Sequence, residues 1–495
     1  MKLCDLLSPI PDLASDIPNM EIQTITENSR LCDANTLFVC IEGHRSDGHR
    51  YASDAYKRGC RTFLAQKELE LPSDAITFKT PDTRHALALL ACRFYGDPSH
   101  RLSVIGVTGT KGKTTVACMI RKILEDNGIS CGYIGTNGVD FCGRHEEIGN
   151  TTPDAITLQR TFDKMVNVGC KAVVLEVSSQ ALLQHRVDGT RFLCGVYTNL
   201  YSDHIGDGEH CDFENYKACK HRLFTDFEMK SVICNTDDPY APDMVNGCCA
   251  EIFTCAANHA ANFRCTQIEH KRSSQALGMT FNILYQNQSV SFSIPMIGIG
   301  NVLNATQAAT VAHACFEISL ENAAQALQTV QVSGRSDVIP LRSGSLAVID
   351  YAHNGESLRH ILTELRKFCP SRIICLFGSV GERTTLRRYE LGCAAGELSD
   401  LCILTSDNPA TEDPQKIINE IVEVVIPYGT PYLSIVDREE AIRYAVKILK
   451  HGDILLLAGK GHEEYQLIGT EKIPFSDKSC LLSALEAHEK ESIVL

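Results

Sequence analysis

Short apolar runs alternate with helix-like patterns along most of the chain, which is typical of parallel sheets covered by helices. Residues 104–107 form a β-branched run that predicts a buried strand, and residues 116–124 predict the helix after it. Further apolar runs lie at residues 171–177, 346–350, 373–377, 401–404 and 454–457. The last four are separated by helical stretches and predict a second doubly wound sheet, so the pattern as a whole predicts an α/β protein.

The length of the chain and the positions of its turn and breaker residues predict about three domains. Turn and breaker residues at 95–101 precede the strand at 104–107, so we expect domains at 1–100, 101–334 and 335–495. In the first domain, residues 36–41 predict a strand, and polar loops flank it on both sides. These loops could converge on a ligand, although ordinary turn chemistry accounts for them equally well.

Composition excludes several classes of protein. Hydrophobic residues make up 44% and charged residues 22% of the 495 residues, and no apolar run is long enough for a membrane span. The formal net charge of −14 argues against a general binder of nucleic acid or membrane surfaces. Acidic residues and prolines replace a signal-peptide core at the start, and the 23 cysteines show no CxxC spacing. We therefore expect a cytoplasmic protein with reduced, mostly buried thiols.

A glycine-rich turn between the strand at 104–107 and the helix at 116–124 predicts a phosphate-binding loop. Gly109 and Gly112 let the backbone wrap round an anion, Lys113 adds a positive charge, and Thr114 offers a hydroxyl to Mg²⁺. The strict pattern would place its first glycine at position 107, which is valine here. A purely structural turn is the alternative. Strand, GKTT core and helix all agree, so nucleotide binding is the better interpretation.

Polar residues after this loop suggest metal chemistry. Glu176 interrupts the apolar run at 171–177 near its carboxyl end. A buried carboxylate there needs a partner such as Mg²⁺ beside Thr114, and a glutamate simply exposed at a strand end is the alternative. His204 could serve as a neutral nitrogen ligand near the phosphates. The predicted helix at 214–224 carries lysines, one of which could face metal and phosphate, although solvated surface lysines are the commoner case.

Two further groups of polar side chains could bind ligands. Asn301 and Asn304 are three residues apart on a predicted helix, where they could meet a nucleotide base or act only as caps. Polar loops follow all four strands of the last third, and ligands in open α/β sheets bind beyond the carboxyl ends of strands. Arg383 against Asp407 and Glu463 suits a zwitterionic amino acid, although each loop alone could be a turn.

Eleven motifs occur in the order seen in the Mur ligase family, and the resemblance spans nearly the whole chain. They are ENSR, TLFVCIEGHRSDG, VTGTKGKTT, NTTPDA with LEVSSQALLQHRV, NLYSDH, YKACK, DYAHN, GSVGER, SDNPA and AGKGHEEYQ. The resemblance implies a small α/β UDP-binding domain, a central P-loop ATPase domain with a parallel sheet and a C-terminal Rossmann-like domain. It also implies ATP-dependent addition of a free diamino acid to the D-glutamate carboxylate of UDP-MurNAc-L-Ala-D-Glu through an acyl phosphate, in peptidoglycan precursor synthesis.

The same resemblance assigns roles residue by residue. The catalytic residues would be Lys113, Glu176, His204 and Lys220. The ATP-binding residues would be Thr108, Gly109, Thr110, Lys111, Gly112, Lys113, Thr114, Asn301, Asn304, Arg335, Asp350 and His353. The Mg²⁺ ligands would be Thr114, Glu176, His204 and a carbamylated Lys220. The residues binding UDP-MurNAc-dipeptide or the amino acid would be Ser29, His44, Arg45, Ser46, Thr151, Thr152, Ser178, Gln184, Arg186, Arg383, Asp407, Asn408, Gly459 and Glu463.

Three positions depart from the family pattern. Lys111 stands where many relatives have asparagine, and Gln180 stands where histidine is frequent. Ala410 replaces the arginine with which relatives grip the second carboxylate of meso-diaminopimelate. An unpaired carboxylate would cost about 1–3 kcal/mol, so L-lysine is the expected amino acid and meso-diaminopimelate the alternative. A folylpolyglutamate-synthase-like ligase and a non-catalytic, nucleotide-gated binding protein are the competing functions, and we expect a monomer.

Overall fold

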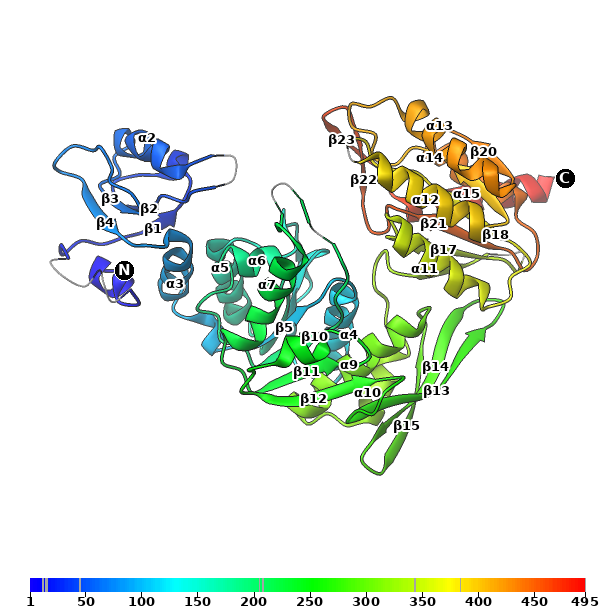
Figure 1. Cartoon of the computed structure of the whole chain (residues 1–495), viewed down its shortest axis with the longest axis horizontal. Coiled ribbons are helices and arrows are strands. Elements are labelled where there is room, and N and C mark those ends of the chain that lie inside the picture. Colours follow the sequence, from blue (N-terminus) through cyan, green and yellow to red (C-terminus); the bar gives the residue numbers. More distant parts are fainter. Residues whose placement is uncertain are drawn as a thin grey trace. The chain divides into compact units, whose positions relative to one another are not determined.

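The computed structural model describes residues 1–10, 13, 17–43, 46–203, 205–206, 209–341, 344–382 and 384–494, with side chains up to residue 487. The chain forms two compact units, Met1–Arg264 with Thr306–Ala323 and Cys265–Ala305 with Ala324–Leu495. The described strands form three larger sheets, coloured blue, cyan to green, and yellow to red in Figure 1, and a two-stranded sheet of residues 465–468 and 471–474. The domain boundaries near residues 100 and 334 stay a prediction.

The first sheet of the first unit has four parallel strands in the order β1-β2-β3-β4. The expected strand at 36–41 is confirmed as β2, whose four residues are all buried. The elements of this region are α1 (Leu3–Leu7), β1 (Thr24–Thr26), η2 (Ser29–Leu31), β2 (Thr36–Val39), η3 (Gly48–Tyr51), α2 (Ala52–Lys57), β3 (Thr62–Ala65), β4 (Ile76–Lys79), α3 (Thr83–Phe94) and η4 (Pro98–His100). The polar segments after β1 and β2 lie at the carboxyl edge of two paired parallel strands, so both loops can serve one ligand.

The second sheet of this unit contains the strand order β12-β11-β10-β5-β9-β6-β7-β8. The predicted strands at 104–107 and 171–177 are confirmed as β5 and β9, which pair in parallel. The elements are β5 (Ser103–Thr108), α4 (Lys113–Asp126), β6 (Cys131–Gly135), β7 (Gly138–Phe141), β8 (Arg144–Glu146), α5 (Ala155–Asn167), β9 (Ala172–Glu176), α6 (Ser179–Leu183), β10 (Cys194–Tyr197), α7 (Phe213–Thr225), β11 (Ser231–Asn235), α8 (Ala241–Val245) and β12 (Glu251–Ala256). The next strand, β13 (Phe263–Arg272), begins in this unit, and most of its residues belong to the second unit. Two helices complete the region, α9 (Ile299–Phe316) and α10 (Leu320–Leu327).

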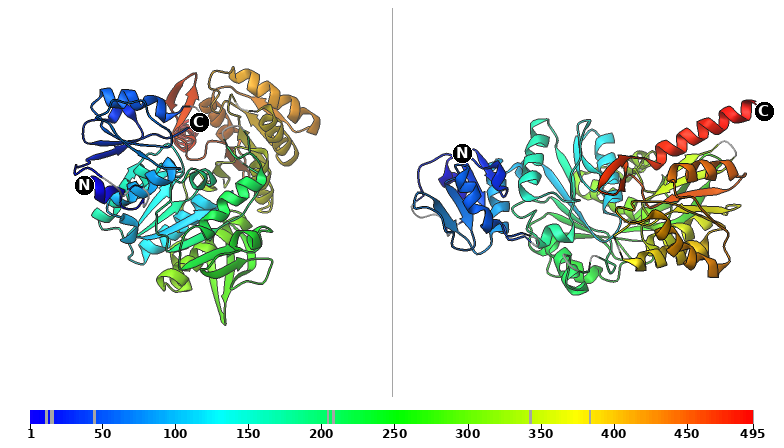
Figure 2. Two further views of the ribbon diagram at one scale, coloured as in Figure 1. Left: turned by 60° about the vertical axis from the view of Figure 1, so that its left-hand side comes forward. Right: turned by 90° about the horizontal axis from the view of Figure 1, so that it is seen from above.

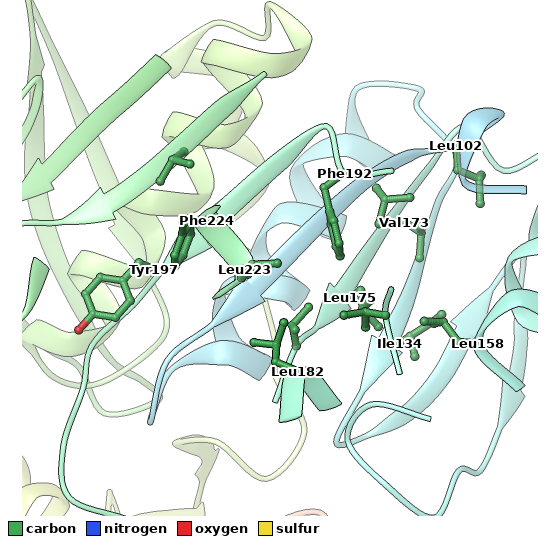
Figure 3. Close-up of a cluster of buried hydrophobic side chains, with 14 of the residues drawn as sticks. Leu102, Ile134, Leu158, Val173, Leu175, Leu182, Phe192, Tyr197, Leu223 and Phe224 are labelled. Carbon is green, nitrogen blue, oxygen red and sulfur yellow. The ribbon is translucent and has the colours of Figure 1, made fainter. Parts of the chain in front are cut away.

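A continuous apolar core lies against this sheet. Figure 3 shows Val173 and Leu175 of β9 between Phe192 and Ile134, and Leu158 and Leu223 come from the covering helices α5 and α7. Each of these side chains is almost fully buried. Within β9, Glu176 is the residue whose buried side chain needs polar partners.

The second unit contains a six-stranded sheet in the order β16-β17-β21-β18-β19-β20, in which only the β16–β17 pair is antiparallel. The four strands predicted in this region are confirmed as β17, β18, β19 and β21. The elements are β14 (Leu277–Tyr285), β15 (Gln288–Ile294), β16 (Asp337–Pro340), β17 (Leu346–Asp350), α11 (Gly355–Arg366), β18 (Ile373–Phe377), α12 (Thr385–Leu398), β19 (Leu401–Leu404), α13 (Pro414–Val425), η5 (Ile426–Tyr428), β20 (Tyr432–Ser434), α14 (Arg438–Ile448), β21 (Ile454–Ala458), β22 (Tyr465–Ile468), β23 (Glu471–Pro474) and α15 (Asp477–Val494). Figure 2 shows α15 as one long helix, which packs on α14.

Two expectations from composition can be compared with the structure. All 23 cysteines are free thiols, and many of them are buried. Among the residues that the structure describes, no helix is both long and apolar enough to cross a membrane.

Candidate functional site

The phosphate loop lies between β5 and α4, as the sequence predicts. Gly112 is the N-cap of α4 with φ 86°, and Gly109 has φ 145°, so both positions favour glycine. A Cβ atom at Gly109 would lie 1.9 Å from Thr198 Oγ1, which leaves no space for any side chain. The loop therefore passes tightly over the end of β10, and it leads directly into the N-terminus of α4, whose positive dipole end favours an anion.

Residues that follow β10 hold the phosphate loop in place. The backbone N–H of Thr110 donates to Asn199 O at 2.9 Å, and that of Lys111 donates to Asn199 Oδ1 at 2.9 Å. The hydroxyl of Thr198 donates to Lys111 O at 2.7 Å. Both faces of the Thr110-Lys111 peptide segment are thus fixed by one strand end.

Two lysines meet at the same carbonyl of this loop. Lys113 Nζ donates to Gly109 O at 2.8 Å and to Thr110 O at 3.0 Å, while Lys220 Nζ donates to Gly109 O at 2.9 Å. Lys220 comes from α7, is only 2% exposed and lies 4.5 Å from the centre of the Tyr216 ring. Burial, reinforced by the neighbouring Lys113 charge, holds the pKa of Lys220 well below its usual value. This lysine therefore faces the phosphate loop and not solvent.

Glu176 is a fully buried carboxylate at the end of β9. Its Oε1 accepts hydrogen bonds from Tyr133 Oη at 2.6 Å and from the backbone N–H of Thr136 at 3.1 Å, and its Oε2 accepts from Thr136 Oγ1 at 3.2 Å. A Cβ atom at Gly135 would lie 2.2 Å from Glu176 Oε1, so glycine is needed for this approach. These three donors are neutral groups, so a bound cation would be needed to neutralise the negative charge of the carboxylate.

The residues expected to bind the sugar-peptide form one hydrogen-bonded network with Glu176. Thr152 Oγ1 donates to Glu176 O at 2.7 Å and accepts from the backbone N–H of Ser178 at 3.0 Å. Arg186 Nη1 donates to Thr152 O at 2.7 Å, and Arg186 Nη2 donates to Gln184 Oε1 at 2.7 Å. The network brings a carboxylate suited to metal and a guanidinium suited to an anionic substrate onto adjacent segments.

Two more residues connect this network to its surroundings. Thr151 Oγ1 lies 3.1 Å from Thr136 Oγ1, next to Glu176. Glu27, which follows β1, has a pKa raised by burial and by Asp154, while the nearby charges of Arg84 and Arg186 lower it. The loop after β1 is therefore electrostatically coupled to the substrate network.

The predicted UDP-binding residues are only partly described. Ser29 begins η2 immediately after β1, and Ser46 Oγ donates to Tyr51 Oη at 3.2 Å in the segment after β2. His44 and Arg45 lie outside the described residues. His204, the expected metal ligand, also lies outside them.

The two asparagines of α9 share a helix face, as their spacing predicts. Asn304 Nδ2 donates to Asn301 Oδ1 at 3.0 Å, and Asn301 Nδ2 donates to Ile297 O at 2.8 Å. Asn304 is 8% exposed. Their amides are therefore fixed by each other and by a backbone carbonyl just before α9.

A second group of predicted nucleotide-binding residues gathers at the end of β17. Asp350 Oδ2 accepts from the Ser336 backbone N–H at 2.8 Å, and burial raises its pKa against the lowering effect of Arg335. The Arg335 guanidinium lies 4.9 Å from the centre of the Tyr351 ring, which also contacts the rings of His353 and His462. Such a platform of a guanidinium and flat rings can stack on a planar ligand.

The amino-acid loops of the second unit surround a buried lysine that sequence reasoning missed. Lys460 is fully buried, and its Nζ lies 3.0 Å from Asn408 Oδ1, 3.0 Å from Glu463 Oε2 and 3.7 Å from Asp407 Oδ1. Asn408 Nδ2 also donates to Glu463 Oε2 at 2.9 Å. Burial raises the pKa of Asp407, and the Arg438 and Lys460 charges lower it. A Cβ atom at Gly459 would lie 2.6 Å from Asp407 Oδ2.

Four of the predicted amino-acid residues, Asp407, Asn408, Gly459 and Glu463, are thus brought together from two strand ends. Arg383 lies outside the described residues. The missed residues are Lys460, Tyr133, Thr136, Tyr351 and His462. A lysine between two glycines directly after a buried strand was the available signal for Lys460, whereas the sequence around Tyr133 and Thr136 carries no comparable pattern.

Comparisons with known proteins agree with this arrangement. Three family models match, namely "Mur ligase family, catalytic domain" at residues 21–95, "Mur ligase middle domain" at 107–312 and "Mur ligase, glutamate ligase domain" at 334–461. The chain is 36% identical to the UDP-N-acetylmuramoyl-L-alanyl-D-glutamate–2,6-diaminopimelate ligase of Caldanaerobacter subterraneus subsp. tengcongensis, over 99% of this chain and 100% of that protein. It is 37% identical to the corresponding ligase 2 of Clostridium acetobutylicum, over 97% and 98%.

A solved structure of a ligase with the same substrate name superposes with a TM-score of 0.74 at 27% identity, over 99% of this chain and 100% of that chain. The predicted fold class, three α/β domains, is confirmed by this similarity together with the family models.

Proposed function

Because this chain belongs to the Mur ligase family, whose members are ATP-dependent ligases that form amide bonds, we propose that it joins a diamino acid to the D-glutamate carboxylate of UDP-MurNAc-L-Ala-D-Glu. The observation that carries the proposal is the network from Glu176 through Thr152 to Arg186, beside the phosphate loop. It offers a place for an anionic sugar-peptide next to the phosphoryl donor. Similarity over the full length supports this function over a folylpolyglutamate-synthase-like activity.

The reaction would proceed in two balanced steps. The glutamate carboxylate attacks the γ-phosphorus of ATP, which forms an acyl phosphate and releases ADP. The neutral amine of the diamino acid then attacks the acyl carbon and the amide C–N bond forms. The C–O bond to the phosphoryl group breaks, inorganic phosphate leaves with one oxygen of the former carboxylate, and the proton lost by the amine passes to this phosphate or to water. Lys113 and the backbone N–H groups of residues 109–114 would neutralise charge on the transferring phosphoryl group.

The donor set at the phosphate loop fits magnesium. Thr114 offers a hydroxyl oxygen, and Glu176 offers a buried carboxylate whose described donors are neutral. Bound Mg²⁺ would supply charge neutralisation for the phosphates. Glu176 is the last residue of β9, where it is opposite Val107 of the paired strand β5, and Thr114 lies in the first turn of α4, the helix that follows β5.

Lys220 would complete a second oxygen-rich position as a carbamate. Carbon dioxide adds to a neutral amine and gives a carbamate anion and a proton, which converts a buried cation into an oxygen ligand. Burial of Lys220 and the nearby positive charge of Lys113 both disfavour the ammonium form of Lys220. His204 is the proposed partner ligand.

For the amino acid, we propose 2,6-diaminopimelate, the alternative in the sequence analysis, because both relatives described above are named for it. L-Lysine is the second candidate, favoured by Ala410. Ala410 is 8% exposed with φ 51°, and its backbone N–H donates to Leu467 O at 3.1 Å while its carbonyl accepts from Gly469 N–H at 2.7 Å. A position used for backbone pairing with β22 gives no donor for a carboxylate, so another group would have to supply it.

The test is an assay of purified protein with ATP, UDP-MurNAc-L-Ala-D-Glu and a panel of diamino acids, read by mass spectrometry. We expect a tripeptide product with meso-diaminopimelate and much less with L-lysine. A dipeptide labelled with ¹⁸O in the glutamate carboxylate should deliver one labelled oxygen to the released phosphate. Unlabelled phosphate would rule out the acyl phosphate, and preferential use of L-lysine would rule out the proposed amino acid.

A further inference from the structure

A cluster of two histidines and an aspartate lies outside the site described above. His85 Nδ1 is 2.7 Å and His185 Nδ1 is 2.6 Å from the same oxygen, Asp188 Oδ2. The three candidate ligand atoms lie within 4.8 Å of one another. His85 comes from α3, and His185 and Asp188 follow α6, so the cluster joins segments about a hundred residues apart.

Asp188 carries an oxygen that the surrounding protein does not satisfy. The residue is 7% exposed, and its Oδ1 atom is buried without a hydrogen-bond partner in the part of the chain that the structure describes. A buried carboxylate oxygen without a donor costs free energy, so such an atom is expected to have a partner that side chains alone do not provide. All three residues line a cavity of about 1270 Å³, which can admit an ion and water.

A fourth residue is placed to orient one of the imidazoles. Asp82 is the N-cap of α3, where its Oδ1 accepts from the backbone N–H groups of Arg84 and His85. Its other oxygen, Oδ2, lies 3.5 Å from His185 Nε2. When a histidine binds a metal through one nitrogen, the other nitrogen usually donates to a carboxylate in this way.

We propose that His85 Nδ1, His185 Nδ1 and Asp188 bind one divalent transition-metal ion, with Zn²⁺ as the best match, and that Asp82 orients His185. Two imidazoles and a carboxylate with an open fourth position for water are a ligand set typical of Zn²⁺. The proton of each imidazole shifts from Nδ1 to Nε2 on binding, and His185 Nε2–H then donates to Asp82. Ligand atoms at about 2.0–2.2 Å from the ion would separate by roughly 0.6 Å from their present hydrogen-bonded distances.

The charges around the cavity and the position of His185 in the chain indicate how the ion would be held and which segment it would fix. The cavity lining also includes Arg101, Arg191 and Arg222, so direct ligation and not long-range attraction must hold the cation. His185 lies between Gln184 and Arg186, the residues of the substrate network. A bound ion would therefore fix the segment 184–188 to α3.

The experiment is zinc titration of the nucleotide-free protein by calorimetry, with three variants. His85 has a half-exposed side chain, so His85→Ala should fold normally, and circular dichroism checks this. Asp82→Asn keeps an N-cap side chain but removes the carboxylate. His145→Ala is the matched control, because His145 Nδ1 also contacts an aspartate, Asp140, at 2.8 Å but belongs to no candidate metal group among the described residues.

We expect His85→Ala to bind one zinc ion fewer per chain than the unmodified protein, Asp82→Asn to bind that ion about tenfold more weakly, and His145→Ala to bind it normally. Cobalt(II) spectra separate this site from cysteine thiolates, because only thiolate ligation adds an intense near-ultraviolet charge-transfer band. The proposal is wrong if His85→Ala and the unmodified protein bind the same number of zinc ions, or if the lost ion carries a thiolate band. Neither result depends on ligase activity, so the proposed function is tested separately.

Discussion

Two buried lysines, one in each unit, show how different surroundings give the same side chain different uses. Lys220 donates to a backbone carbonyl, faces an aromatic ring and lies beside Lys113. Lys460 lies among Asn408, Glu463 and Asp407 and is fully enclosed by them and their neighbours. The first ammonium group is destabilised by its site, whereas the second is paired with carboxylates.

Burial alone therefore does not define a functional lysine. A buried cation with carboxylate partners holds loops together, and its removal leaves those carboxylates unpaired. A buried amine without that compensation is driven toward its neutral form, which is the form that can react with carbon dioxide. Three substitutions, Lys113→Ala, Lys220→Met and Lys460→Met, test this difference in four measurements.

The largest effect on activity is expected from substituting Lys113, the lysine whose charge lies next to Lys220. Lys113→Ala should lower kcat/KM for ligation by about 10³-fold or more, because a charge that stabilises the transferring phosphoryl group is lost. Phosphate release and product mass spectrometry measure this. Lys111→Ala, in the same loop, is the control and should lose about tenfold or less; near-normal turnover of Lys113→Ala would contradict the assignment.

The next effect concerns Lys220 itself. Lys220→Met keeps the side-chain length but cannot form a carbamate, so kcat should fall by about 10²–10³-fold. In carbon dioxide-depleted buffer the unmodified enzyme should lose activity and regain it with bicarbonate, whereas Lys220→Met should not respond. Lys217→Met, one turn earlier on α7 and paired with Glu214, should behave like the unmodified enzyme. A bicarbonate response that survives in Lys220→Met would exclude this lysine as the carbamylated group.

Lys460→Met should have its main effect on stability. Without the ammonium group, Asp407 and Glu463 lose their buried partner, so the free energy of unfolding of the second unit should fall by about 3 kcal/mol. Urea unfolding followed by hydrogen exchange in β21 would measure it. Lys472→Met, at an exposed position over the Tyr465 ring, should change stability by about 0.5 kcal/mol or less. Equal losses in the two variants would show that Lys460 is not the partner of these carboxylates.

The smallest effect has the opposite sign. Because burial lowers the folded-state pKa of Lys220 below its unfolded value of 10.5, the unfolded state binds more protons between these two values, and stability rises with pH through that window. In carbon dioxide-depleted buffer, Lys220→Met should stabilise the first unit by about 1 kcal/mol near pH 7, and the gain should shrink toward pH 10. Urea midpoints at both pH values test this, and a destabilised Lys220→Met at neutral pH would refute it.

Local signals in the sequence predicted the scaffold of the site. The strand, glycine loop and helix around Lys113 follow from residues adjacent in the chain, and so do the carboxylate at the end of β9 and the polar loops after β19 and β21. The resemblance then identified Lys220 as the lysine of α7 that faces the loop, which helix spacing alone did not separate from its surface neighbours.

What the sequence could not provide were pairings between distant residues. Tyr133 and Thr136 reach Glu176 across some forty residues, and their hydroxyls could have faced solvent with equal plausibility. Lys460 looked like part of a turn because only Glu463 lies in its own loop, whereas Asp407 and Asn408 follow another strand, β19. The spacing of these residues in the sequence indicates neither their burial nor their partners, so these pairings became visible only in the folded structure.

The anchoring of Thr110 and Lys111 by Asn199 affects both the association rate and the entropy of nucleotide binding. Because the loop is already hydrogen-bonded to the residue after β10, it loses little conformational freedom when a triphosphate binds. Nucleotide binding should therefore have a small entropy penalty and an association rate set mainly by diffusion. Asn199→Ala, which releases one of these ties, should therefore make the entropy of nucleotide binding more unfavourable in calorimetry.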